Sequence, residues 1–540
     1  VVNRVLVDNF KTRYNFIMFD LIIKKATVIN GKNEKPFVAD VGINNGQIAE
    51  IGNLKNQTAT KDINAENLVL CPGFIDINNT ADHNFTIFSY PEAENLIRQG
   101  VTTVVLGNYG ASLAPLIKVS LANFSKWTNV DKINIDWQTI GEMFDFLENK
   151  KIGVNVSSLV GWGNIRNDLT EGEFRPLTKE ELEKGKFLVE KSLKEGALGV
   201  SFGLGYAQEK MVGFSEIEKV AEIVKKYNGY LGFYLRDEEK NFLKSLEEII
   251  EIVKTTQLPV EINRFQAKGE KNYPFFEEAL KLIKKTNRNK KLIHFDFSPY
   301  EYSSEDIFQV LPEWVTIGGR TAFFRNIRDN DYRKKILEEL SEKRDIYKKA
   351  IIVDANKCWW FNNLSIEEIA NNFEFSIEET ILEIAELCEG RATLLVKNIS
   401  FDNIKLALTD PYSLIGSDNG FLNIEELEKK TWVHPAIFSA FIRFLKLFIQ
   451  EGKRNSLEKA INKITYQPAL KIGLKKRGLI DKGYWADLIL FNPKELKDLA
   501  DMKNPFQYPL GIKTVIINGN LAYHKGILSS QRYGKVIRRN

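Results

Sequence analysis

The sequence predicts an α/β protein: a (β/α)8 TIM-like barrel, a small β-sandwich built from both chain termini, and a helical insertion between strands seven and eight. Along the middle of the chain, short apolar runs alternate with long amphipathic ones, a pattern typical of parallel βα units. Eight such runs occur, which is the number that closes a barrel. Near both ends, alternating β-branched residues are broken by Asn-Gly pairs, which favour tight hairpin turns.

The expected barrel strands cover residues 68–77, 101–107, 153–160, 199–202, 230–235, 260–264, 292–297 and 412–418. Chemistry in such barrels lies where strands end and βα loops begin, so the residues just after each run are the candidates for a site. The predicted domains are residues 18–66 for the N-terminal part of the β-sandwich, 67–470 for the barrel and 471–540 for the C-terminal part of the β-sandwich. Within the barrel, residues 302–404 are too long for a simple crossover and form the helical insertion.

An aromatic run, K-C-W-W-F-N-N at residues 357–363, stands out within the insertion. If it were exposed, Trp359 and Trp360 would form an apolar cluster on the surface. Two interpretations are open. The two indoles pack inside the insertion, or they cap the barrel mouth or contact a partner.

Composition and charge exclude several classes of protein. The 540 residues carry 75 Lys and Arg against 71 Asp and Glu, so no basic surface for nucleic acid is expected. Cys71, Cys358 and Cys388 are far apart, which argues against a disulfide framework or a cysteine zinc site. The sequence contains no run of about 18 apolar residues, the length that would indicate a membrane-spanning helix. We expect a cytoplasmic protein whose partner is a small molecule or another protein, and oligomer formation is left open.

Several phrases resemble one known family. They are L-C-P-G-F-I-D-I at 70–77, G-V-T-T-V-V-L-G-N-Y-G-A-S-L-A-P at 100–115, E-G-A-L-G-V-S-F-G-L-G-Y at 195–206, I-G-S-D-N-G at 415–420 and R-G-L-I-D-K-G-Y-W-A-D-L at 477–488. This text resembles the amidohydrolase superfamily and, within it, the N-acyl-D-amino-acid deacylases, or D-aminoacylases. The resemblance implies hydrolysis of the amide of an N-acylated D-amino acid by a zinc-activated water.

The resemblance also implies where zinc ligands would stand, and this chain departs from the family pattern at five of those positions. I-N-N-T replaces the H-x-H after strand one, which puts Asn78 and Thr80 in place of two imidazoles. Tyr109 replaces the thiolate after strand two, Tyr234 a histidine at strand five, and Arg264 a ligand at strand six. These groups are poor or impossible zinc donors, so we expect no metal and no cofactor, although the family would use zinc.

Asp418, the acid at the end of strand eight, is retained as the candidate catalytic residue. In the family this acid moves the proton between the water and the leaving amine. The remaining predicted pocket residues are Trp162, Gln266, Ser298, Ser304, His434 and Ala436. Ala436 stands where the family has an arginine that would hold a substrate carboxylate in two-point fashion, which alanine cannot do.

Two alternatives concern what fills the vacated positions. His83 with Asp82 lies just beyond strand one, near the expected mouth, and offers the start of a relocated metal site. Arg264 is predicted to bind Asp418 through both arms of its guanidinium and to hold it ionised. The alternative is that Arg264 turns outward to solvent or to Glu270.

Three functional hypotheses follow. The first is a pseudoenzyme that has lost zinc-dependent amide hydrolysis and binds a ligand or partner. The second is an active hydrolase of C–N bonds in N-acyl-amino acids or related cyclic amides, with an altered metal site. The third is a scaffold subunit beside an active enzyme.

Overall fold

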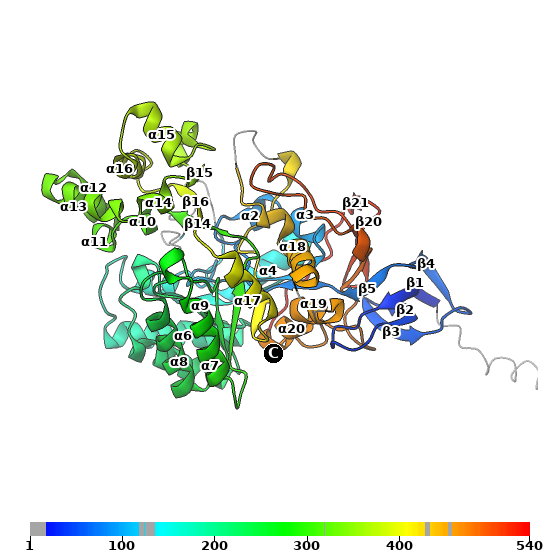
Figure 1. Cartoon of the computed structure of the whole chain (residues 1–540). Helices are drawn as coiled ribbons and strands as arrows, with labels where there is room; N and C mark the ends of the chain where they lie inside the picture. Colours follow the sequence, from blue (N-terminus) through cyan, green and yellow to red (C-terminus); the bar gives the residue numbers. More distant parts are fainter. Residues whose placement is uncertain are drawn as a thin grey trace, which may run out of the picture.

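The computed structural model describes residues 18–117, 124, 135–317, 319–426, 432–451 and 456–539. They form a central barrel with its helices, a β-rich part made from both ends of the chain, and an insertion (Figure 1). In the view of Figure 1 the insertion and the β-rich part lie on opposite sides of the barrel. This is the predicted fold class.

The barrel is made of parallel strands in two hydrogen-bonded sheets, ordered β6-β7-β8 and β9-β10-β11-β12-β13-β17. β8 and β9 are two halves of one barrel strand interrupted at Leu159, so the described residues occupy eight strand positions. The strands are β6 (Phe74–Asp76), β7 (Val101–Leu106), β8 (Asn155–Ser158), β9 (Val160–Gly161), β10 (Gly199–Gly203), β11 (Tyr230–Tyr234), β12 (Val260–Ile262), β13 (Ile293–Phe297) and β17 (Ser413–Ile415).

The run predicted as the first barrel strand is divided between two sheets. Its first half, β5 (Val69–Pro72), pairs with strands from both ends of the chain, and its second half, β6, pairs with β7. Gly73 separates the halves. A Cβ at Gly73 would lie 2.1 Å from Oγ1 of Thr102, so the close approach of the two segments requires glycine.

Amphipathic helices cover the outside of the barrel. In α7, for example, Ile217, Val220, Ala221 and Val224 recur at helical spacing and are buried. The helices are α2 (Thr86–Ser89), α3 (Glu94–Ile97), α4 (Ile140–Lys150), α5 (Trp162–Leu169), α6 (Lys179–Lys194), η2 (Ala207–Glu209), α7 (Phe214–Lys226), α8 (Phe242–Thr256), η3 (Glu270–Asn272), α9 (Phe275–Thr286), α17 (Phe401–Thr409), η5 (Ile424–Glu426), α18 (Ala436–Glu451), α19 (Leu457–Ile464) and α20 (Tyr466–Ile472).

Strands from the two ends of the chain share one nine-stranded sheet, as predicted. Its order is β21-β20-β19-β18-β5-β1-β2-β3, with β4 paired to β1. The predicted Asn-Gly hairpin joins β2 to β3, with Asn45 and Gly46 at φ 50° and 76°. The elements are β1 (Met18–Val28), β2 (Phe37–Asn44), β3 (Gln47–Gly52), β4 (Thr58–Asn64), β18 (Leu488–Phe491), η6 (Pro493–Glu495), β19 (Ile512–Ile517), β20 (Asn520–His524) and β21 (Ile527–Leu528).

The insertion between β13 and β17 is mostly helical, but it also contains a three-stranded antiparallel sheet ordered β14-β16-β15. It has its own hydrophobic core, which includes Ile307, Ile352 and Leu394. Its elements are β14 (Tyr302–Asp306), α10 (Ile307–Val310), α11 (Glu313–Thr316), α12 (Gly319–Arg328), α13 (Asn330–Ser341), α14 (Arg344–Tyr347), β15 (Ile351–Asp354), η4 (Asn356–Phe361), α15 (Ile366–Phe373), α16 (Ile377–Leu387) and β16 (Thr393–Lys397).

The structure does not show the indoles of Trp359 and Trp360 packed inside the insertion. Trp359 and Trp360 are 51% and 52% exposed, and Phe373 and Phe375 are also exposed. Their rings are linked through buried Phe361 by centroid separations of 5.8 to 6.3 Å. We call Trp359, Trp360, Phe373 and Phe375 the aromatic patch.

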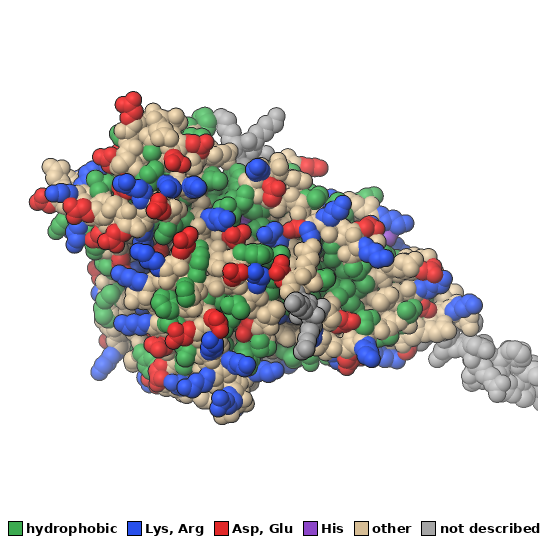
Figure 2. All heavy atoms as spheres, in the orientation of Figure 1, with side chains coloured by type: hydrophobic (Ala, Val, Ile, Leu, Met, Phe, Trp, Pro, Cys, Tyr) green, Lys and Arg blue, Asp and Glu red, His purple; other side chains and the backbone are tan. Residues whose placement is uncertain are grey.

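The surface carries both signs of charge without segregation. Lys, Arg, Asp and Glu side chains are interspersed over the face in Figure 2, in keeping with the nearly balanced composition. Among the described residues, no helix is long and apolar enough to cross a bilayer.

Candidate functional site

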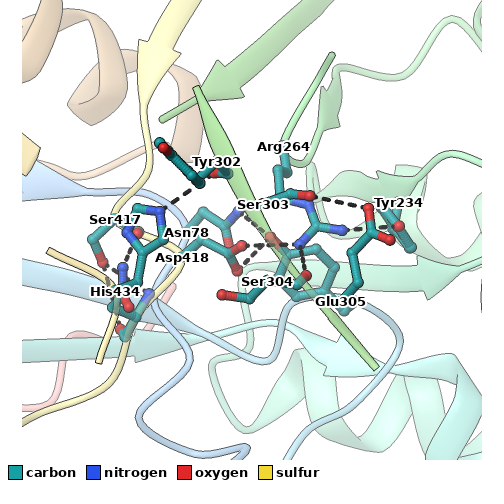
Figure 3. Close-up of polar contacts among 12 residues, drawn as sticks. Asn78, Tyr234, Arg264, Tyr302, Ser303, Ser304, Glu305, Ser417, Asp418 and His434 are labelled. Carbon is teal, nitrogen blue, oxygen red and sulfur yellow. Dashed lines mark hydrogen bonds and ion pairs between the residues drawn. The ribbon is translucent and has the colours of Figure 1, made fainter. Parts of the chain in front are cut away.

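The candidate site lies at the carboxyl ends of the barrel strands, where the fold class places chemistry. Asn78 follows β6, Tyr109 follows β7, Tyr234 ends β11, Arg264 follows β12 and Asp418 follows β17. Direct contacts link these five side chains, so the structure brings together five of the residues that the sequence singled out. Figure 3 shows Asn78, Tyr234, Arg264 and Asp418.

Arg264 is the centre of this cluster. Its backbone has φ 49°, and its N–H donates to Oδ1 of Asp296 at 3.1 Å, which turns the side chain into the mouth. One terminal nitrogen lies 3.4 Å from Oδ2 of Asp418 and also donates to the Ser304 carbonyl at 3.2 Å. The other donates to the Tyr234 hydroxyl at 2.9 Å.

This geometry confirms the contact between Arg264 and Asp418 but not its two-point form. Only one arm of the guanidinium faces Asp418, because the other lies between the Tyr234 hydroxyl and the Glu238 carboxylate, 3.5 Å from Glu238 Oε2. The side chain therefore does not turn outward to solvent or to Glu270. Burial works against the charge of Arg264, but coulombic interactions with its neighbours raise its pKa above the ordinary value.

Asp418 is held from two sides. Oδ1 accepts a hydrogen bond from the Tyr109 hydroxyl at 2.7 Å, and Oδ2 faces Arg264. The carboxylate keeps one-fifth of its side-chain surface exposed. Burial raises the pKa of Asp418, and the attraction of Arg264 and the Tyr109 hydrogen bond offset this only in part.

A second group of contacts fixes the floor of the mouth. Nδ2 of Asn78 donates to the Tyr109 hydroxyl at 2.7 Å and to Oδ1 of Asp296 at 3.0 Å. Burial raises the pKa of Asp296 to about 7. Burial and the charge of Asp418 raise the pKa of Tyr109 well above its ordinary value, so its phenol remains a donor.

Sequence analysis missed a buried charge network behind Tyr234. Lys268 Nζ lies 2.8 Å from Oε2 of Glu238 and 3.2 Å from Oε1 of Glu305, and all three side chains are buried. Burial alone would raise the pKa of Glu305, but Lys268 and hydrogen bonds from Ser303 and Asn398 lower it to about 2. The available signal was Glu238, four residues after Tyr234 at a strand end.

Ser304, Gln266 and Ser298 are three of the six predicted pocket residues, and Thr80 is one of the predicted vacated ligand positions. Ser304 contributes its carbonyl oxygen to Arg264. Thr80 is buried, and its N–H donates to the Asn419 carbonyl at 3.1 Å. The Gln266 Nε2 and Ser298 Oγ atoms are buried without a hydrogen-bond partner among the described residues.

The other three pocket residues have structural contacts. Trp162 is fully buried at the start of α5, where its indole donates to Glu216 of α7 at 2.7 Å, so it does not open into the mouth. Nδ1 of His434 accepts the N–H of Ala436 at 3.0 Å, and Nε2 faces the Tyr302 carbonyl at 3.3 Å. Burial lowers the pKa of His434 to about 4, so the ring is neutral.

The residues at the mouth do not fit a metal ion. Zinc is held by imidazole, thiolate and carboxylate groups, and the mouth offers amide, phenol and guanidinium groups beside the carboxylates of Asp418 and Asp296. No group of three or more His, Cys, Asp or Glu that could hold a metal exists in the part of the chain that the structure describes. Asp82 and His83 are buried 3.8 Å apart, but they do not belong to such a group.

A barrel of parallel βα units, with its mouth at the strand ends and a sheet from both termini, defines an amidohydrolase-type fold. The model of the Amidohydrolase family matches residues 390–523. The chain is 27% identical over 525 residues to the D-aminoacylase of Alcaligenes xylosoxydans xylosoxydans, covering 96% of this chain and 98% of that protein. The N-acyl-D-glutamate deacylase of the same organism is 24% identical, with 96% and 97% covered.

Solved structures agree with this relationship. A crystal structure of D-aminoacylase superposes with a TM-score of 0.81 at 25% identity, covering 96% of this chain and all of that one. L-hydantoinase from Arthrobacter aurescens, at 12% identity and a TM-score of 0.58 with 97% of this chain and all of that one covered, shares the fold alone. The chain is thus similar to the D-aminoacylases over nearly its whole length, and its residues 390–523 match the Amidohydrolase family model, as the resemblance implied.

The comparisons contradict one prediction, that of no cofactor. D-aminoacylase is described with a binuclear metal centre, and the N-acyl-D-glutamate deacylase of Bordetella bronchiseptica is seen in complex with zinc. The group to which this chain is related is therefore metal-dependent, and the prediction is wrong. Its error was to infer a whole protein's cofactor from five positions. The misfit of the donors at those positions is a separate observation.

Proposed function

We propose that the barrel mouth binds an N-acylated amino acid and no longer hydrolyses its amide bond. The observation that carries this proposal is the Arg264 guanidinium at the centre of the mouth, in contact with Asp418 and Tyr234. The ligand class is taken from the relatives, which are named as deacylases of N-acyl-D-amino acids.

A physical argument supports the loss of hydrolysis. A general base needs an oxygen that can reach the proton of the attacking water. Both oxygens of Asp418 already face donors, from Tyr109 and from Arg264. The guanidinium offsets part of the rise in the pKa of Asp418 that burial causes, so the carboxylate is a weaker base than burial alone would make it.

An active hydrolase is the second candidate. Two observations favour it: Asp418 stands at the end of β17 with part of its surface exposed, and similarity to deacylases extends over 96% of the chain. The same mouth would then act on N-acyl-amino acids or related cyclic amides.

One experiment separates the two candidates. The purified full chain is incubated with N-acetyl-D-leucine and N-acetyl-D-glutamate, with and without added Zn²⁺, and release of the free amino acid is measured. Binding of the same compounds is measured by calorimetry. We expect binding without release above that of the Asp418→Asn variant, which keeps the shape of the side chain.

Release that requires Asp418, in either metal condition, would overturn the proposal in favour of the hydrolase. Absence of both binding and release would overturn it as well. The added Zn²⁺ makes the test independent of how the protein was purified.

A scaffold role is the third candidate and is favoured by the exposed aromatic patch, since large apolar patches on soluble proteins mark contact surfaces. A cytoplasmic location is part of the same proposal. It is supported by Cys71, Cys358 and Cys388, which are free thiols.

A further inference from the structure

A cavity of about 600 Å³ lies between the barrel mouth and the insertion. We call it the insertion cavity. Tyr206, Tyr234 and Lys268 line it on the barrel side, and Phe308, Leu311 and Arg391 line it on the insertion side. This is the size range of pockets that enclose small organic molecules.

The insertion cavity reaches the mouth through shared residues. Tyr234 lines the cavity and accepts the hydrogen bond from Arg264. Glu305 also lines it and lies beside the Arg264 cluster in Figure 3. A ligand in the cavity therefore lies next to the cluster that contains Asp418.

Most charges that line the cavity are already neutralised by a neighbour. Lys268 pairs with Glu238 and Glu305, and Lys343 lies 2.8 Å from Glu239. These ion pairs stabilise the cavity wall, and their charged groups are less available to bind a ligand.

Arg391 differs from them. It is half-buried, its Nε is buried without a hydrogen-bond partner, and it has no ion pair with any residue that the structure describes. A buried donor without an acceptor costs about 1–3 kcal/mol and calls for an explanation. Because Nε is buried, a ligand in the cavity can meet only the terminal nitrogens of the Arg391 guanidinium.

The backbone conformation before Arg391 places this residue beside an apolar part of the insertion cavity wall. Glu389 and Gly390 have φ 54° and 71°, which ends α16 in a tight turn. A Cβ at Gly390 would lie 2.2 Å from ring atoms of Phe308, so glycine is needed for the ring to pack there. Arg391, the next residue, lines the same cavity as Phe308.

From these observations we infer that Arg391 binds the carboxylate of the ligand, and that the ligand's apolar group lies against the aromatic rings of the insertion cavity. A guanidinium recognises a carboxylate with two parallel hydrogen bonds. Arg391 supplies this contact from the insertion, whereas Ala436 at the start of α18 is fully buried and offers none. The inference rests on the proposed function, which supplies the ligand class.

The test compares an acid with its uncharged amide. Dissociation constants of N-acetyl-D-leucine and N-acetyl-D-leucinamide are measured for the wild type and for Arg391→Gln, Arg391→Lys and Lys240→Gln at fixed ionic strength. Lys240→Gln is the matched control, since Lys240 is an exposed cation that lines the same cavity. Thermal unfolding checks that each variant is folded.

We expect Arg391→Gln to weaken binding of the acid about tenfold or more, the loss of a charged hydrogen bond, and to leave the amide unchanged. Arg391→Lys should restore part of the affinity, and Lys240→Gln should change both constants less than about threefold. Equal affinity of wild type and Arg391→Gln for the acid, or equal losses for acid and amide, would overturn the inference alone. If the wild type binds neither compound, the proposed function fails with it.

Discussion

Replacing Arg264 with methionine should destabilise the protein by about 3 kcal/mol. Removal of one partner of a buried ion pair costs about 3–5 kcal/mol, because the other charge is left buried. Two observations place this case at the lower end. Asp418 keeps 20% of its side chain exposed, and Glu238 retains Lys268 at 2.8 Å. The hydrogen bond to the Tyr234 hydroxyl is lost as well.

The double variant Arg264→Met/Asp418→Leu should cost less, about 1 kcal/mol, because no charge is stranded and the main loss is the acceptor of the Tyr109 hydroxyl. Urea unfolding followed by circular dichroism at constant pH measures both, with an unchanged dependence on urea as the condition for comparison. An Arg264→Met variant as stable as the wild type would refute the reasoning. So would a double variant whose loss equals the sum of the losses measured for Arg264→Met and Asp418→Leu singly.

Three further predictions use the same unfolding assay or fluorescence. Lys268→Met strands two buried carboxylates and should cost about 3–5 kcal/mol, whereas Lys343→Met, which breaks a half-exposed pair, should cost about 0–1 kcal/mol; similar losses would contradict this. Burial raises the pKa of Asp296 to about 7 in the folded state, so the native protein keeps a proton that the unfolded chain releases. As the pH rises from 5 to 7, the stability of the wild type relative to Asp296→Asn should therefore fall by about 1.4 kcal/mol per pH unit. A flat or rising difference would count against this. Trp359→Phe/Trp360→Phe should remove most of the acrylamide-quenchable fluorescence, and unchanged quenching would mean that the patch is covered.

Sequence periodicity was sufficient for the barrel because each strand is a short apolar run bounded by turn residues. It failed at residues 68–77, where Gly73 breaks one apolar run into strands of two different sheets. The Pro72-Gly73 pair is a turn signal in the sequence, but the close approach of Thr102 that requires glycine there is seen only in the structure.

At the candidate site, resemblance located Asn78, Tyr109, Tyr234, Arg264 and Asp418 because their places at strand ends are fixed by the fold. It could not give the orientation of long side chains. The arms of Arg264 are divided among several acceptors, and this depends on partners from the insertion as well as from the barrel.

The insertion cavity and its charged wall lay beyond prediction for a related reason. Lys268 and Glu305 are 37 positions apart, and only the docking of β14 against the barrel brings them within 3.2 Å. The same applies to Arg391, which reads as an ordinary surface residue until the turn at Gly390 and the Phe308 ring are seen together.

The contacts of Arg264 also constrain how this mouth can evolve. Its side chain joins groups from β11, β14 and the loop after β17, and loss of the guanidinium alone leaves Asp418 without its cation. A substitution at position 264 is therefore tolerated only after the acid has changed, so the fitness effect of each mutation depends on the order in which mutations occur. Such epistasis predicts that, among descendants of this sequence, positions 264 and 418 change together or not at all.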